Sequence, residues 1–201
     1  MDYAVIVLLW AGYCFLHSLL ISVGVTTLMA RLMKKWYAVY RILYVAISFV
    51  LLVPLLRFTS GLEGPDIITY ASTVNILRYV LITASLALFF WSFFFDYDAL
   101  SFFGIRQILN SKRSPQTVAS AGLKKKGLLG FTRHPMYLTL LVYLWCQIYS
   151  MVDLVVTIVL TIYIFIGTRL EERKLVLEFG ESYIAYQREV PMLIPFRMRR
   201  T

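Results

Sequence analysis

The side chains best suited to chemistry begin with the run Arg133-His134-Pro135-Met136-Tyr137. Proline is favoured at the first position of a helix, because its missing N–H would have no partner there. The run therefore predicts a helix that starts at Pro135, with free amide groups and the positive end of the helix dipole beside Arg133 and His134. Such a helix start can bind a carboxylate or a phosphate. The alternative is a membrane-interface anchor, in which His134 has no chemical task.

Two adjacent acids, Glu171 and Glu172, form the second candidate group. At about 100° per residue, Glu172 heads a helical stripe that continues through Val176, Phe179, Tyr183 and Tyr186. Glu171 falls on a different stripe. An acid that heads an aromatic stripe close to a bilayer is unusual for a surface helix. The alternative is an amphipathic interfacial helix whose acids pair with the neighbouring basic residues.

Weaker candidates flank these two groups. A lysine- and glycine-rich run, which includes Lys125, Gly127 and Leu128, leads into the Arg-His-Pro motif, and glycine lets a backbone approach a ligand closely. His17 and Arg41 lie near the inner ends of two apolar segments. Ionisable groups inside a membrane are functional candidates, although a lone histidine can equally form a hydrogen bond between helices. The sequence contains no set of His, Cys and acidic residues with metal-ligand spacing, so no metal is expected.

The elements that must position these groups are apolar helices. Hydrophobic residues make up 60% of the 201 residues, charged residues only 15%, and the mean hydropathy is +0.73. We therefore expect an all-α polytopic membrane bundle of about five transmembrane helices, since each span needs roughly 20 apolar residues. Chain 1–201 is expected to form one integral-membrane domain, with a three-helix part (1–95) and a core (96–201) that carries the polar motifs. The five expected spans are about 3–25, 37–56, 76–95, 135–150 and 154–170.

Basic residues set the expected orientation. In a five-span arrangement, 18 of the 20 Lys and Arg residues lie on one side, with only Arg57 and Arg78 on the other. The positive-inside rule makes the basic side cytoplasmic, so the N-terminus is expected outside and the C-terminus in the cytoplasm. Topology and anionic lipid then account for the net charge of +9, and a nucleic-acid partner is not expected.

The order and spacing of these motifs, between Leu123 and Phe196, resemble the integral-membrane S-adenosylmethionine-dependent methyltransferases of the isoprenylcysteine carboxyl methyltransferase and phospholipid methyltransferase superfamily. Within it, Ser-Phe-Phe-Gly-Ile-Arg-Gln at 101–107 and Val-Pro-Met-Leu-Ile-Pro at 190–195 look like the methanethiol S-methyltransferase branch. His17-Ser-Leu-Leu together with Tyr40-Arg41-x-x-Tyr44 is similar to that branch and to NnrU-type proteins.

The resemblance implies that S-adenosylmethionine binds between the lead-in run, the start of the fourth helix and the Glu-Glu helix. The implied catalytic residues are Arg133, Glu172, His17 and Arg41. The implied cofactor contacts are Lys125, Gly127, Leu128, His134, Tyr137, Glu171, Glu172 and Tyr183. Which of the two glutamates holds the cofactor amino group stays open.

The implied activity is methyl transfer to a small lipophilic acceptor, with a thiol as the leading choice. The alternatives are the carboxyl group of a prenylcysteine-like substrate and the amine of a phospholipid. Two other classes are a non-catalytic membrane protein or transporter, and an NADPH-dependent sterol-type reductase. The expected surroundings are the lipid bilayer of a bacterial or archaeal inner membrane, with the site on the cytoplasmic side. The sequence does not define an oligomeric state.

Overall fold

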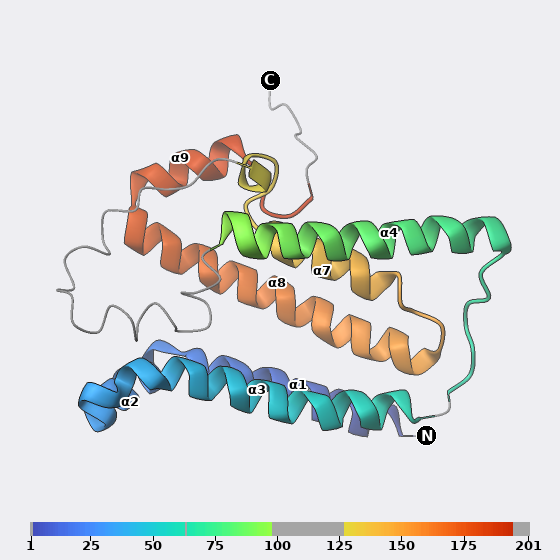
Figure 1. Ribbon diagram of the computed structural model, residues 1–201, viewed down its shortest axis with the longest axis horizontal. Coiled ribbons are helices and arrows are strands. Elements are labelled where there is room, and N and C mark those ends of the chain that lie inside the picture. The colour runs from blue at the N-terminus through green and yellow to red at the C-terminus, as the bar shows by residue number, and fades with distance from the viewer. Residues whose placement is uncertain (1, 63, 98–126, 195–201) are drawn as a thin grey trace. The chain divides into compact units, whose positions relative to one another are not determined.

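A computed structural model describes residues 2–62, 64–97 and 127–194 of the chain. Apart from one isolated bridge between Asp66 and Ser150, every regular element in these ranges is helical, which confirms the predicted all-α class. The principal helices are α1 (Tyr3–Ile21), α2 (Val23–Met33), α3 (Tyr37–Ser60), α4 (Ser72–Trp91), α7 (Pro135–Trp145), α8 (Met151–Phe179) and α9 (Glu181–Glu189) (Figure 1). Short helical turns lie at η1 (Lys34–Trp36), η2 (Ser92–Asp96) and η4 (Gly127–Gly130).

Four segments of the described chain are long and apolar enough to cross a membrane: Tyr3–Ile21, Val39–Ser60, Ser72–Asp96 and Met151–Phe179. The chain is therefore a polytopic membrane protein. The remaining predicted span, 135–150, forms the 11-residue helix α7. At 1.5 Å per residue that helix is only about 16 Å long, so it cannot cross the hydrocarbon by itself.

Close contacts divide the chain into two units, and the described part of the first comprises residues 2–62, 64–68 and 149–160. Its core is formed by Ile6, Trp10 and Val152, with partly buried side chains of α3 packed against them. Helices α1 and α3 lie side by side (Figure 1), and the Tyr40 hydroxyl donates to the carbonyl of Leu20 at 2.8 Å. The first predicted span, 3–25, ends earlier than expected, because Ser22 adopts an extended ψ of 149° and caps α2.

The described part of the second unit comprises residues 69–97, 127–148 and 161–194. Helix α7 runs antiparallel beside α4 (Figure 1), since its start lies near η2 and its end lies beside the first turns of α4. There, Arg78 Nε donates to the carbonyl of Cys146 at 2.7 Å, and the Tyr70 hydroxyl donates to the carbonyl of Ile148 at 2.8 Å. The short helix and the turn after it thus follow α4 along most of its length. The predicted domain boundary at residue 95 stays a prediction.

The end of helix α8 differs from the prediction in a way that matters for the site. The span expected at 154–170 continues as one helix to Phe179, so the two glutamates lie inside it rather than after it. Gly180 then adopts a φ of +56°, a conformation that favours glycine, and α9 folds back. The predicted aromatic stripe is therefore divided between two helices. On one straight helix Tyr183 would lie about 16 Å beyond Glu172, whereas the turn brings its hydroxyl to 3.3 Å from the Glu172 carboxylate.

Candidate active site

The centre of the site is a buried ion pair between Arg133, just before α7, and Glu172 in α8. Arg133 Nε and Nη2 donate to the two carboxylate oxygens of Glu172, the second at 2.9 Å, while Nη1 donates to the carbonyls of Gln187 and Val190. Glu172 accepts further hydrogen bonds from Tyr183 and from the Gln187 amide at 3.1 Å. Removal of either charge would leave the other buried without a counter-ion, which is strongly destabilising. Within the protein, four of the five N–H donors of Arg133 and both carboxylate oxygens of Glu172 are thus hydrogen-bonded.

Residues 190–192, which follow α9 and are called the strap below, hold the start of α7 through hydrogen bonds. The backbone amides of Arg133 and His134 donate to the carbonyls of Pro191 and Met192 at 3.0 and 3.2 Å, and the Thr132 hydroxyl also donates to Met192. These two amides precede the helix and are occupied, whereas the free amides that the sequence predicts belong to the first turn of α7. Pro135 has no N–H, and no described side chain caps this turn, so the N–H groups of Met136 and Tyr137 are the ones that can bind an anion.

His134 connects the ion pair to the second glutamate. The ring is 1% exposed, and its Nε2 lies 3.2 Å from Glu172 Oε1 while its Nδ1 lies 3.8 Å from Glu171 Oε2. Because Nε2 faces a carboxylate, we assign the ring proton to Nε2, and in this tautomer Nδ1 is an acceptor. Both Nδ1 and Glu171 Oε2 are buried and have no hydrogen-bond partner among the described residues. Two adjacent acceptors without a donor favour a ligand that carries N–H groups.

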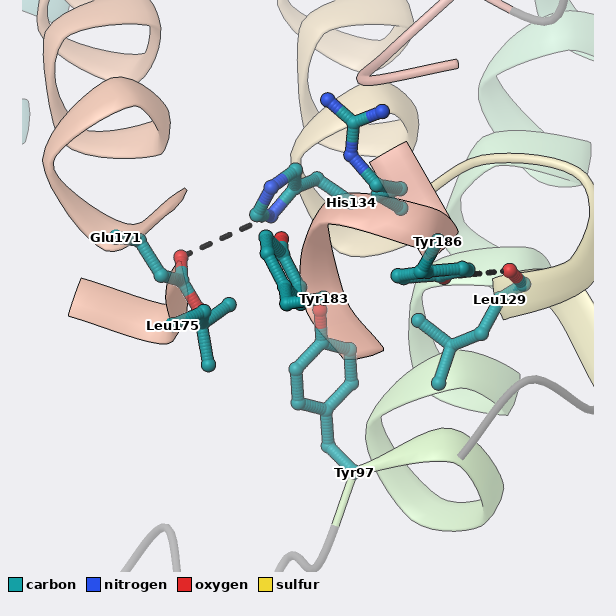
Figure 2. A pocket seen from close by; sticks show the side chains of 8 residues that line it. Tyr97, Leu129, His134, Glu171, Leu175, Tyr183 and Tyr186 are labelled. Atoms are coloured by element: carbon teal, nitrogen blue, oxygen red, sulfur yellow. Dashed lines mark hydrogen bonds and ion pairs between the residues drawn. The ribbon is translucent and has the colours of Figure 1, made fainter. Parts of the chain in front are cut away.

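A pocket opens beside this acceptor pair, and Figure 2 shows its aromatic walls. The His134 ring stacks on Tyr137 with 5.6 Å between centroids, and Tyr183 and Tyr186 meet edge to face at 5.8 Å. The Tyr186 hydroxyl donates to the carbonyl of Leu129 at 2.6 Å, which ties α9 to η4. The lining residues are Tyr97, Leu129, Arg133, His134, Glu171, Leu175, Tyr183 and Tyr186.

The tyrosines of the pocket outside the spans are held in their protonated form. Burial is the main cause that raises the pKa of Tyr183, with the charge of Glu172 adding to it and Arg133 opposing it. Burial likewise raises the pKa of Tyr186 to about 12, against the lowering effect of Arg133. These phenols therefore present neutral rings and hydroxyl donors at physiological pH, and neither can act as a phenolate nucleophile.

The structure brings together most of the residues that the sequence singled out. Arg133, His134, Glu171 and Tyr183 line one pocket, with Tyr137 stacked on His134 and Glu172 bonded behind them. Gly127 and Leu128 lie in η4, the turn that also supplies Leu129. Lys125 lies outside the described residues, as do the motif at 101–107 and Pro195.

The two predicted catalytic residues of the amino-terminal helices, His17 and Arg41, belong to the first unit. His17 Nδ1 lies 3.0 Å from the Ser48 hydroxyl, and the ring stacks on Tyr13 at 6.2 Å. This contact joins α1 to α3, as the alternative of an interhelical hydrogen bond described. A role for His17 and Arg41 in catalysis stays a prediction.

Sequence reasoning did not identify Tyr97 or Gln187, and it used the motif at 190–195 for the resemblance without finding its contacts to the start of α7. Gln187 follows Tyr183 by four residues, so helical spacing could have placed it beside the glutamate. Tyr97 carries no comparable signal, because it reaches the site through the turn after α4. The contacts of residues 190–192 are made by backbone carbonyls, which residue types do not reveal.

Comparison with known proteins finds relatives in the family that the motifs resemble. The chain is 32% identical to methanethiol S-methyltransferase 1 of Bradyrhizobium diazoefficiens, over 78% of this chain and 53% of that protein. It is 42% identical to methanethiol S-methyltransferase of Pseudomonas deceptionensis and 38% identical to that of Crocosphaera subtropica, over 46% and 47% of this chain. These alignments cover 36% and 37% of the two relatives, so the chain spans between about a third and a half of the length of the proteins it matches.

No family model matches the chain, and no solved structure matches it. The curated relatives nevertheless carry one enzyme name across several bacteria. By sequence the chain is thus similar to proteins named methanethiol S-methyltransferase, which confirms the predicted resemblance.

Proposed function

We propose that the protein is an S-adenosylmethionine-dependent methyltransferase that methylates the sulfur of a small lipophilic thiol. The names of its relatives support a methyltransferase, and the described pocket has acceptors that fit this methyl donor. Because the chain spans only part of each relative, the activity is assigned here as a proposal about this chain.

The observation that carries the proposal is the orphaned acceptor pair formed by His134 Nδ1 and Glu171 Oε2. A primary ammonium group has three N–H donors and a positive charge, so it complements both atoms at once. S-adenosylmethionine has such a group at its amino-acid end. We therefore assign the amino group to Glu171 and His134, and the neighbouring carboxylate to the uncapped first turn of α7.

Glu172 and Arg133 act one step further from the ligand. Because each is bonded to the other and to α9 or the residue after it, we propose that they position His134 rather than touch the cofactor. Their charges offset each other, so Glu171 is the carboxylate among the lining residues that remains for the cofactor ammonium group.

When bound, S-adenosylmethionine supplies an electrophilic methyl group on a sulfonium sulfur. The aromatic faces of Tyr137 and Tyr183 suit a sulfonium through cation–π attraction. We assign to the pocket the positioning of the methyl group against its acceptor, which accounts for most of the acceleration of a displacement reaction. A thiol reacts as its thiolate, and we assign its deprotonation and orientation to His17 and Arg41.

The membrane has a direct use in this scheme. Apolar helices admit a lipophilic acceptor from the bilayer, and the polar cofactor enters from water. We place the site at the cytoplasmic face of an inner membrane, since the charged motifs cluster on the basic side of the chain.

The test uses the full-length protein in detergent or reconstituted vesicles. Calorimetric titration with S-adenosylhomocysteine measures cofactor binding, and radiolabelled methyl uptake by methanethiol, a prenylcysteine and phosphatidylethanolamine identifies the acceptor. We expect binding of the nucleoside and uptake by the thiol. No binding at millimolar ligand would overturn the proposal, while uptake by another acceptor would retain the cofactor and replace the substrate. His17→Ala is expected to lower thiol turnover and leave cofactor affinity unchanged.

A further inference from the structure

Asp96, at the end of the turn η2, is a buried acid with no task in the scheme above. Its side chain is 9% exposed, and its Oδ2 is buried without a hydrogen-bond partner among the described residues. A buried carboxylate oxygen without a donor costs free energy, so it calls for an explanation. The turn that carries it is π-helical, a geometry that is frequent at functional sites.

The other oxygen of Asp96 lies against Gly127, the first residue of η4. A Cβ atom at Gly127 would meet Asp96 Oδ1 at 2.5 Å, and the residue adopts a φ of +70°. Both the space and the backbone conformation therefore require glycine at this position. The contact holds the Asp96 carboxylate against the turn whose Leu129 lines the pocket.

Asp96 lies next to Tyr97, which lines the pocket together with Glu171. Tyr97 lines the pocket, and although burial is the main cause that raises its pKa, the charges of Glu171 and Asp96 also contribute. Asp96 likewise contributes to the raised pKa of Tyr186. The two carboxylates thus both act on Tyr97, one from α8 and the other from the end of η2.

We infer that Asp96 accepts hydrogen bonds from the ribose hydroxyls of the bound nucleoside, an inference that rests on the proposed function. An ionised carboxylate only accepts hydrogen bonds, and vicinal hydroxyls offer it two donors. The adenine edge is a poorer match, because its amino donor lies beside a ring nitrogen that repels a carboxylate. The ammonium group is already matched by Glu171 and His134. The nucleoside then extends past Tyr97 toward η4.

The experiment is a thermodynamic cycle that combines one substitution in the protein with changes in the ligand. It measures binding and needs no turnover. Wild-type protein and Asp96→Asn are titrated with S-adenosylhomocysteine, with its 2′,3′-dideoxyribose analogue and with its inosine analogue. We expect Asp96→Asn to bind S-adenosylhomocysteine about ten- to a hundredfold more weakly, as for a lost hydrogen bond to a charged group. Both proteins should bind the dideoxy analogue with the same affinity. Glu178→Gln, which removes an exposed carboxylate of α8, is the matched control and should bind like wild type.

Each other outcome overturns a defined statement. If wild type does not bind S-adenosylhomocysteine, the proposed function itself fails. If wild type binds S-adenosylhomocysteine and Asp96→Asn lowers the affinity for the dideoxy analogue by the same factor, Asp96 has only a structural role. If the loss disappears with the inosine analogue instead, the carboxylate contacts the base and not the ribose.

A second variant covers the case in which Asp96→Asn does not fold. Asp96→Ser removes the carboxylate and leaves Gly127 and the backbone of η4 as they are. It should weaken S-adenosylhomocysteine and leave the dideoxy analogue unchanged, and equal losses for both ligands would overturn the inference.

Discussion

Glu171 and Glu172 are neighbours in sequence with different surroundings. The Glu172 side chain is 10% exposed and accepts hydrogen bonds from Arg133, Tyr183 and Gln187, whereas that of Glu171 is 34% exposed and has a buried oxygen without a described partner. The sequence left open which glutamate holds the cofactor amino group, and the proposal assigns this role to Glu171. Substitution by glutamine should therefore affect stability at Glu172 and cofactor affinity at Glu171.

Glu172→Gln should reduce stability. The neutral amide leaves the Arg133 guanidinium buried without a counter-ion, which costs about 3 to 5 kcal/mol for a buried pair. Thermal unfolding in detergent, followed by circular dichroism, should show a clearly lower midpoint. A midpoint equal to that of wild type would mean that the pair does not hold α7 to α8.

Glu171→Gln should weaken cofactor binding and leave the unfolding midpoint near that of wild type. Loss of a hydrogen bond to a charged group predicts an affinity for S-adenosylhomocysteine about ten- to a hundredfold lower. Calorimetry measures this affinity, and Glu178→Gln serves again as the control. Unchanged affinity would mean that Glu171 does not bind the cofactor.

Tyr186 makes stability depend on pH in the alkaline range. Its pKa is raised, chiefly by burial, from about 10 to about 12 in the folded protein, so the folded state holds the proton more tightly than the unfolded state. The stabilisation is complete below pH 10 and is lost as pH rises through 12. The unfolding midpoint of wild type should therefore fall between pH 10 and 12 more steeply than that of Tyr186→Phe. Equal slopes for the two proteins would contradict this prediction.

At the scale of elements, the turn at Gly180 determines whether α9 can reach α8. Gly180→Ala places an L side chain at a φ of +56° and should cost about 1 to 2 kcal/mol, although no atom blocks the added methyl group. Gly167→Ala, in the interior of α8 with open space around it, is the matched control and should be neutral or stabilising by up to about 1 kcal/mol. Unfolding midpoints compare the two, and an equal effect of both changes would show that the turn is not strained.

The elements themselves were largely predictable from sequence, because apolar length and proline position are local signals. The start of α7 at Pro135 and the spans of α3 and α4 follow from them. The break at Ser22 and the continuation of α8 past Leu170 were not predicted, since polar residues can either cap a helix or lie within it. In the site, residue types indicated His134 and Glu171, whereas Asp96 and the 190–192 carbonyls depend on tertiary contacts that no spacing encodes.

At the scale of the whole molecule, the distribution of basic residues predicts an orientation that can be measured. We expect Glu178 on the cytoplasmic side and Asp66 on the other side. In a background without Cys14 and Cys146, a membrane-impermeant maleimide applied to intact cells should label Asp66→Cys and not Glu178→Cys. The opposite pattern would invert the topology, and labelling of both would indicate leaky cells or a mixed orientation.

The strap that secures the start of α7 imposes an order on biosynthesis. Arg133 and the Val190 carbonyl that it contacts are 57 positions apart, so at about 5 to 20 residues per second a ribosome needs roughly 3 to 11 seconds to make the connecting chain. A nascent polypeptide stalled within this window would contain most of its long apolar helices and yet lack the carbonyls that hold Arg133 and His134, so this part of the fold is completed only after the helices have been made.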